Sequence, residues 1–293
     1  GLGNDVVGVS HECDFPVEAR KKRAVIHSRI PAGATAGEID KLVREYVERG
    51  ESVYSVDVQA LREIVPDLIV TQDLCHVCAA SPDDLAGALA GLEKHPSVLS
   101  LNPQKLEDVW RDILVVGRET SRGELAEQLM KGIRERLEAV RKSVEKIAER
   151  PRVVFLEWLE PLYVGGHWTP EMIPLAGGED VFGRARKASF RIDAQEVIDV
   201  APEIIVVAPC GYGAEQARAE YSAMKFSEGW NAMPAVRSGR VYAFEANSYS
   251  SRPGPRLVTG IEALAKMFHP AIEIGDESAR AFVPVQVSAT AKA

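Results

Sequence analysis

The sequence predicts an α/β protein made of two similar lobes that are joined by a single long helix. Three observations predict this fold class. A stripe of aliphatic residues in the middle of the chain indicates one uninterrupted amphipathic helix. Short aliphatic runs on both sides of it are typical of buried parallel strands. One helix–turn–strand pattern also occurs twice, once on each side of the long helix.

The long helix is expected over residues 121–150. Ser121-Arg122-Gly123-Glu124 has the pattern of a capping box, and Pro151 ends the segment. The apolar positions follow at steps of three and four residues and so share one helix face; they are Leu125, Leu129, Ile133, Leu137, Val140, Val144 and Ile147. A coiled coil is the alternative, but the α/β-like halves on either side favour a rigid connector.

The repeated pattern begins at Val56-Asp57-Val58-Gln59 and again at Ile192-Asp193-Ala194-Gln195. Each copy leads through a short helix to a proline, an acidic residue and an aliphatic strand. The offset is 136 residues throughout, and five positions are identical. Asp is a favourable helix N-cap, so each copy indicates a capped helix followed by a buried strand. Two unrelated units could share this pattern by chance, but it supports two lobes of like architecture.

The other expected elements complete this scheme. Strands are expected at residues 6–10, 67–71 and 98–101 in the first lobe and at 152–157, 204–208 and 240–244 in the second. A closing helix is expected at residues 256–268, and residues 273–293 are expected to form a mostly polar, loosely held tail.

Composition excludes several classes of protein. The formal net charge of −8 argues against a nucleic-acid-binding surface. No apolar run approaches the ~18 residues needed to span a membrane. Four cysteines are too few for a disulfide-stapled scaffold. The chain opens without a signal-peptide pattern, so either such a peptide was removed or none existed, which leaves the compartment open.

Chemistry-bearing residues follow the predicted strands. Ligands of open α/β sheets gather outside the carboxyl ends of the strands, so these residues are expected on one rim. They are His11, Glu12, Cys13, Asp14, Gln72, Asp73, Cys75, His76, Cys78, Asn102, Glu157, Trp158, His167, Trp168, Cys210, Tyr249 and Arg252. All four cysteines are among them, which scattered core cysteines would not produce.

The cysteines have three interpretations. Cys75-x-x-Cys78 has no second pair, so a zinc ribbon is excluded. The residues are small buried side chains that anchor a loop, or a soft-metal or metal-chelate site, or a redox pair at the start of a helix. The candidate metal ligands are Cys13, Cys75, Cys78 and Cys210, with His11 and His76 as further donors.

The aromatic residues after the first strand of the second lobe have two interpretations. Trp158, His167 and Trp168 are core residues, or they form an aromatic wall for a flat organic ligand, with Arg252 and Arg256 donating forked hydrogen bonds to its polar groups. The rigid run Arg252-Pro253-Gly254-Pro255-Arg256 shapes the mouth of the site, or it starts the last helix, or both. Glu12, Asp14 and Glu157 are the candidate acids or bases. The sequence has no Ser-His-Asp spacing, nucleophile elbow, P-loop or GxGxxG, so nothing commits it to catalysis.

Taken together, the motifs resemble a known family. They are HECDFP at 11–16, TQDLCHVC at 71–78, EWLEPLYVGGHW at 157–168, PEMIPLAGG at 170–178, APCGYG at 208–213 and NSYSSRPGPRL at 247–257. The sequence resembles the cobalamin-binding-protein branch of the vitamin B12/iron-chelate substrate-binding proteins of ABC transporters, from about residue 1 to residue 270. The resemblance implies the class III periplasmic-binding-protein fold, in which two Rossmann-like lobes are joined by a backbone helix.

The resemblance also implies the organisation and role of the chain. An N-terminal lobe is expected at 1–118, without its first strand, then the long helix at 119–151, a C-terminal lobe at 152–270 and a flexible tail at 271–293. The implied function is non-enzymatic: cobalamin or another corrinoid, or a related metal chelate, is held between the lobes for an ABC transporter permease. The implied location is periplasmic or extracellular, or cytoplasmic if the native gene has no signal peptide. The alternatives are a cytoplasmic metal- or thiol-dependent protein, with or without enzymatic activity, and a docking protein without a small ligand.

Overall fold

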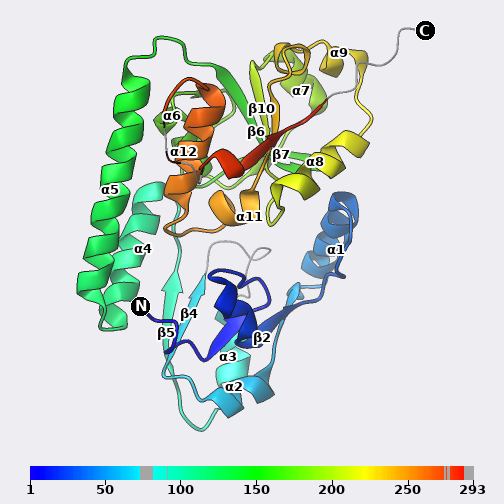
Figure 1. Cartoon of the computed structure of the whole chain (residues 1–293). Coiled ribbons are helices and arrows are strands. Elements are labelled where there is room, and N and C mark those ends of the chain that lie inside the picture. Colours follow the sequence, from blue (N-terminus) through cyan, green and yellow to red (C-terminus); the bar gives the residue numbers. More distant parts are fainter. Residues whose placement is uncertain (73–81, 91, 274, 276–277, 287–293) are drawn as a thin grey trace. The chain divides into compact units, whose positions relative to one another are not determined.

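A computed structural model describes residues 1–72, 82–90, 92–273, 275 and 278–286 (Figure 1). These residues form two compact units, 1–102 and 103–293, and each is described by itself. The expected boundaries at residues 118, 151 and 270 stay a prediction.

The first unit holds two small sheets. β1 (Gly8–Ser10), β2 (Arg23–Ser28) and β3 (Tyr54–Val56) form one, and β4 (Leu68–Gln72) and β5 (Ser97–Leu101) form a separate parallel pair. Its helices are η1 (Val17–Lys21), α1 (Ala36–Glu48), α2 (Val58–Ile64) and α3 (Pro82–Leu89). The three strands expected in this half are confirmed. A small core centred on Leu61, Ala88 and Leu92 holds α2 and α3 against the strands.

The second unit is built on a seven-stranded sheet. The strands are β6 (Arg152–Leu159), β7 (Leu162–Val164), β8 (Glu179–Asp180), β9 (Phe190–Arg191), β10 (Ile204–Val207), β11 (Val241–Phe244) and β12 (Phe282–Pro284). Their order is β12-β11-β10-β6-β7-β9, and β8 pairs with β6. β10 is parallel to both β6 and β11, and all four of its residues are buried, as its continuous run of aliphatic residues predicts. The carboxyl ends of these three strands therefore meet at one edge.

Helices surround this sheet. They are α4 (Leu106–Glu119), α5 (Gly123–Glu145), α6 (Thr169–Leu175), α7 (Ala194–Asp199), α8 (Ala214–Ala223), α9 (Glu228–Asn231), α10 (Pro234–Arg237), α11 (Ala246–Tyr249), α12 (Leu257–Phe268) and η2 (Ser278–Arg280). The closing helix is confirmed as α12, which packs against α5 and α6 and is buried along nearly its whole length (Figure 1). Among the described residues, no helix combines the length and apolarity needed to cross a membrane.

The long helix is α5, which is shorter than expected and follows α4 in a helical hairpin (Figure 1). The expected capping box is wrong. Ser121 lies in a left-handed turn with φ 55°, and no side chain caps α5. The turn is this tight because Gly117 packs on Ala126, where a Cβ on Gly117 would come within 2.4 Å of the Ala126 Cβ. The first two residues of the expected stripe, Leu125 and Leu129, are exposed as a result, and Ala126 and Met130 are buried in their place.

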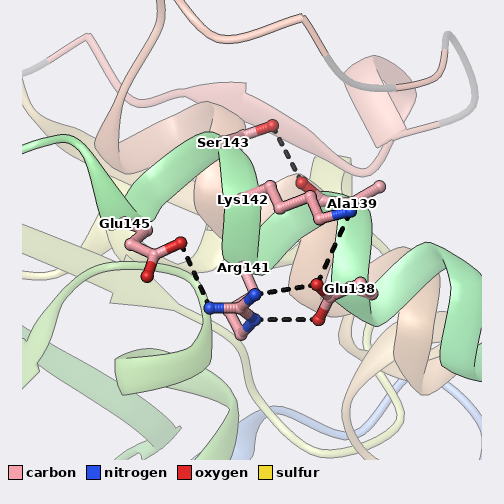
Figure 2. A network of polar contacts seen from close by, with 6 residues as sticks. All are labelled: Glu138, Ala139, Arg141, Lys142, Ser143 and Glu145. Carbon is pink, nitrogen blue, oxygen red and sulfur yellow. Dashed lines mark hydrogen bonds and ion pairs between the residues drawn. The ribbon is translucent and has the colours of Figure 1, made fainter.

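The exposed face of α5 carries a network of ion pairs (Figure 2). Arg141 donates to both oxygens of Glu138 at 2.8 Å and also pairs with Glu145 at 3.1 Å. The Arg141 hydrogen bonds lower the pKa of Glu138 to about 2. Lys142 adds a second cation 3.7 Å from Glu138. These pairs lie at helical spacings of three and four residues, so they support the helix while remaining in water.

The 136-residue repeat extends to the backbone. Asp57 accepts a hydrogen bond from the Ala60 amide at 2.8 Å at the start of α2, and the equivalent Asp193 precedes α7. At the end of these helices, Val65 has φ 44° and Ala201 has φ 43°, and the two positions are also 136 residues apart. Left-handed backbone is uncommon for valine and alanine. Helix and strand propensities alone would not place the same unusual turn in both copies.

The expectation of a loosely held tail is corrected for residues 278–286. β12 pairs antiparallel with β11, with Ala243 opposite Val283. Ala281 and Val285 are buried on either side of this strand. The apolar run from Ala281 to Val285 is short, but it extends the sheet and removes apolar surface from water.

Candidate functional site

The carboxyl edge of β6, β10 and β11 gathers the predicted site residues of the second unit. Glu157 and Trp158 lie near the end of β6, which runs two residues further than expected. The other residues follow a strand directly or lie on the segments beyond it; they are His167, Trp168, Cys210, Tyr249 and Arg252.

Glu157 joins two of these segments. Its backbone carbonyl accepts a hydrogen bond from the Cys210 amide at 3.1 Å, which holds the turn after β10. Its carboxylate accepts a hydrogen bond from the Gly166 amide at 3.1 Å, which holds the segment before His167. Glu157 therefore positions the residues on both sides of it.

Trp168 joins the edge to the segment after α11. Its indole N–H donates to the Ser250 carbonyl at 2.7 Å, and the side chain is only 4% exposed. The hydroxyl of the next residue, Ser251, accepts a hydrogen bond from the Gly211 amide at 3.3 Å. Such deep burial favours the interpretation of Trp168 as a core residue that holds the edge together.

Trp158 and His167 are the more accessible members of the aromatic group. Trp158 is half-buried, and its ring meets Tyr212 edge to face with the centroids 5.8 Å apart. Burial lowers the pKa of His167, so this imidazole is neutral near pH 7. His167 has φ 53°, a left-handed conformation uncommon for a residue with a side chain. The pair offers a flat ring and an uncharged ring nitrogen.

Four predicted residues of the first unit, His11 to Asp14, follow β1 directly. The imidazole of His11 donates from Nδ1 to the Ile26 carbonyl at 3.3 Å, and its Nε2 lies 3.2 Å from the Glu12 carboxylate. The Cys13 thiol contacts the Ser10 hydroxyl at 3.5 Å, and Asp14 is half-buried. Gln72 ends β4, and Asn102 follows β5. Asp73, Cys75, His76 and Cys78 lie outside the described residues.

A metal centre at the cysteines stays a prediction. Within the part of the chain that the structure describes, no group of three or more His, Cys, Asp or Glu side chains is arranged to hold a metal ion. Cys13 and Cys210 are half-buried and belong to different units.

A cavity of about 450 Å³ lies in the second unit, and none of the predicted site residues is among those that line it. Its lining includes Arg150, Glu179 and Asp180. Burial raises the pKa of Asp180 to about 6, although this carboxylate accepts hydrogen bonds from the Phe182 and Gly183 amides. Asp180 thus anchors the start of the loop that leads to β9.

Sequence reasoning missed two features of the carboxyl edge. Tyr212 is buried beside Trp158, and this burial raises the pKa of its hydroxyl, which stays protonated. Residues 184–187 form a loop that pairs with His167: the His167 amide donates to the Lys187 carbonyl at 2.6 Å. The run Arg184-Ala185-Arg186-Lys187 was the available signal, since basic residues are a minority in this acidic chain.

Comparisons with known proteins agree with this architecture. Residues 1–247 match the family model described as periplasmic binding protein. An uncharacterized ABC transporter substrate-binding lipoprotein, YvrC of Bacillus subtilis, is 24% identical over 92% of this chain and 75% of its own length. A vitamin B12-binding protein of Vibrio cholerae is 21% identical over 89% of this chain and 80% of its own length.

Solved structures show the same fold. A periplasmic heme binding protein from Pseudomonas aeruginosa has a TM-score of 0.68 at 19% identity, covering 91% of this chain and 86% of that one. The periplasmic vitamin B12 binding protein BtuF of Vibrio cholerae has a TM-score of 0.65 at 20% identity, covering 92% and 91%. The fold is therefore that of class III periplasmic binding proteins, as the sequence predicts. Because the family model matches most of its length, this chain belongs to the periplasmic binding protein family.

Proposed function

We propose that this periplasmic binding protein holds a corrinoid, a vitamin B12-like ligand, and delivers it to an ABC transporter permease. Several similar proteins are named vitamin B12-binding proteins, which favours a corrinoid over other chelates. The observation that carries the proposal is the hydrogen-bonded edge that joins Glu157, Gly166, Trp168, Cys210 and Ser250. A preformed edge of this kind suits a rigid ligand, because the protein loses little conformational freedom on binding.

The side chains divide into contact and positioning roles. Trp158 offers a flat surface, which packs well against a rigid macrocycle. His167 and Tyr249 offer polar groups to the amide side chains of a corrinoid, and Arg252 offers a forked donor. Glu157 and Trp168 hold these groups in place. Cys210, at the turn after β10, is a further candidate contact.

The predicted residues of the first unit are candidate contacts as well. They are His11, Glu12, Cys13, Asp14, Gln72, Asp73, Cys75 and Cys78. The proposed role is binding and transport rather than catalysis. The proposed location is periplasmic or extracellular, as for the similar proteins described as periplasmic or lipoproteins.

A fluorescence titration tests the proposal. Purified protein is titrated with cyanocobalamin and, in parallel, with haemin, and tryptophan quenching is followed. We expect saturable quenching by cyanocobalamin at lower concentrations than by haemin. Trp158→Ala should weaken corrinoid binding about tenfold or more, the effect typical of an aromatic contact residue.

A matched variant makes the test specific. Trp110→Ala removes a half-buried tryptophan on α4, outside the carboxyl edge, and should leave corrinoid affinity near that of the wild type. Saturable binding of haemin but not of cyanocobalamin would show that the ligand is a haem and not a corrinoid. Stoichiometric zinc or iron in the purified protein, lost in Cys75→Ser/Cys78→Ser, would instead favour a metal-dependent protein.

A further inference from the structure

The loop that precedes β9 differs in charge from the rest of the chain. Between Val181 and Ile192 the sequence has four basic residues and no acidic one, although the chain carries a formal net charge of −8. Arg184, Arg186 and Lys187 all lie on the exposed stretch 183–188. We call residues 184–187 the basic loop. A run of one sign in a chain of the other sign creates a local field that attracts anions.

Two of these cations have no anionic partner in the described protein. No carboxylate of the described residues forms an ion pair with Arg186 or Lys187. Arg184 is engaged differently, with its guanidinium carbon 3.7 Å from the centre of the Phe190 ring. The charges of Arg186 and Lys187 are therefore available to a ligand.

The basic loop is held firmly beside His167. The His167 amide donates to the Lys187 carbonyl at 2.6 Å, and the Arg186 amide donates back to the His167 carbonyl at 3.4 Å. A Cβ on Gly166 would lie 2.1 Å from the Ser189 nitrogen, so only glycine allows this close approach. Gly166 is in turn bound to the Glu157 carboxylate at 3.1 Å. The loop is thus continuous with the edge proposed to bind the ligand.

We infer that the basic loop is a subsite for an anionic group of the ligand, a phosphodiester or a carboxylate, bound beside His167. The inference rests on the proposed function and specifies, in addition, that the bound ligand carries an anionic group. An arginine offers two parallel donors that match the oxygens of such a group, and a lysine adds a point charge. Because the Arg186 and Lys187 side chains are exposed, their contribution to the binding affinity is moderate and falls as the salt concentration rises.

A pair of corrinoids tests the inference. Cyanocobalamin carries a phosphodiester, and dicyanocobinamide lacks it. The variant Arg186→Gln/Lys187→Gln should bind cyanocobalamin about five- to tenfold more weakly than the wild type at low salt. Its affinity for dicyanocobinamide should change less than about twofold, and its cyanocobalamin affinity should depend less on salt.

Lys225→Gln/Arg237→Gln is the matched control, since it removes two exposed cations of the same unit outside the basic loop. It should keep the wild-type ratio of affinities for the two corrinoids. A basic-loop variant with that same ratio and salt dependence would overturn the inference while leaving the proposed function intact. Wild-type protein that binds neither corrinoid would overturn both.

Discussion

The carboxylate of Glu157 and the backbone amide of Gly166 are hydrogen-bonded at 3.1 Å. This bond fixes the segment that carries His167 to the end of a buried strand. The backbone of residues 187–189, at the end of the basic loop, packs so closely against Gly166 that no side chain fits at this position. One carboxylate therefore positions both the proposed contact residue and the loop that follows it.

Replacing Glu157 should separate its acceptor role from its charge. Glu157→Ala leaves the Gly166 amide without its acceptor, and a lost partner of this kind costs about 1–3 kcal/mol. Corrinoid affinity should fall about tenfold in a fluorescence titration, because His167 is no longer held. Glu157→Gln keeps an oxygen acceptor and should retain most of the affinity. Equal affinities for Ala, Gln and wild type would show that Glu157 does not position the site.

Adding a methyl group at Gly166 should destabilise the second unit. The new Cβ would lie 2.1 Å from the Ser189 nitrogen, a backbone atom that cannot move alone. We expect Gly166→Ala to lower the free energy of unfolding by about 2 kcal/mol or more in urea denaturation. Gly132→Ala is the control: no atom lies within 4 Å of its Cβ, so α5 should gain about 0.5–1 kcal/mol. A neutral Gly166→Ala variant would disprove the close packing of the loop.

The link between α5 and α12 depends on a buried carboxylate. Arg136 donates to both oxygens of Glu262, at 2.8 and 2.6 Å, and to the Thr259 hydroxyl at 2.8 Å. Glu262 is only 7% exposed. Arg136→Ala should cost about 3 kcal/mol in the free energy of unfolding, because it leaves this charge uncompensated.

The double variant Arg136→Ala/Glu262→Gln removes the charge as well as its partner. It should therefore be more stable than Arg136→Ala alone, as measured by urea denaturation. The single variant Glu262→Gln completes the comparison. If the double variant lowers the free energy of unfolding by the sum of the two single changes, the two residues are not coupled.

Asp180 should make the stability of the second unit depend on pH. Its pKa is raised by burial from 3.8 to about 6, so the folded state binds the proton more tightly than the unfolded state. This contribution is complete below about pH 4 and is lost as the pH rises through about 6; the total is about 2–3 kcal/mol. Asp180→Asn removes the charge and keeps an acceptor for the Phe182 amide. Its stability relative to wild type should therefore grow between pH 4 and pH 8. A difference that is constant with pH would contradict this.

The sequence predicts the second half of the fold better than the details of its turns. Short continuous aliphatic runs such as Ile204–Val207, bounded by turn residues, favour buried strands, so the positions of these strands follow from the sequence pattern. The turn before α5 could not be predicted, because Ser121 adopts its conformation to let Gly117 pack on Ala126, a contact between two helices. The same holds for β12, whose pairing partner lies far away in sequence.

The candidate site shows the same division. The positions of Glu157 and Cys210 at the carboxyl edge could be predicted, because parallel strands end at one edge. The buried state of Trp168 could not, because it depends on the Ser250 carbonyl from a distant segment. The basic loop was visible as charge in the sequence, but its position beside His167 arises from backbone pairing that charge does not reveal.

Equilibrium dialysis of the purified protein against cyanocobalamin measures corrinoid binding itself. We expect saturable retention of one corrinoid per chain, with a dissociation constant of about 1 μM or below, which corresponds to at least about 8 kcal/mol of binding free energy. Retention no greater than that of a non-binding protein at about 100 μM ligand would contradict it.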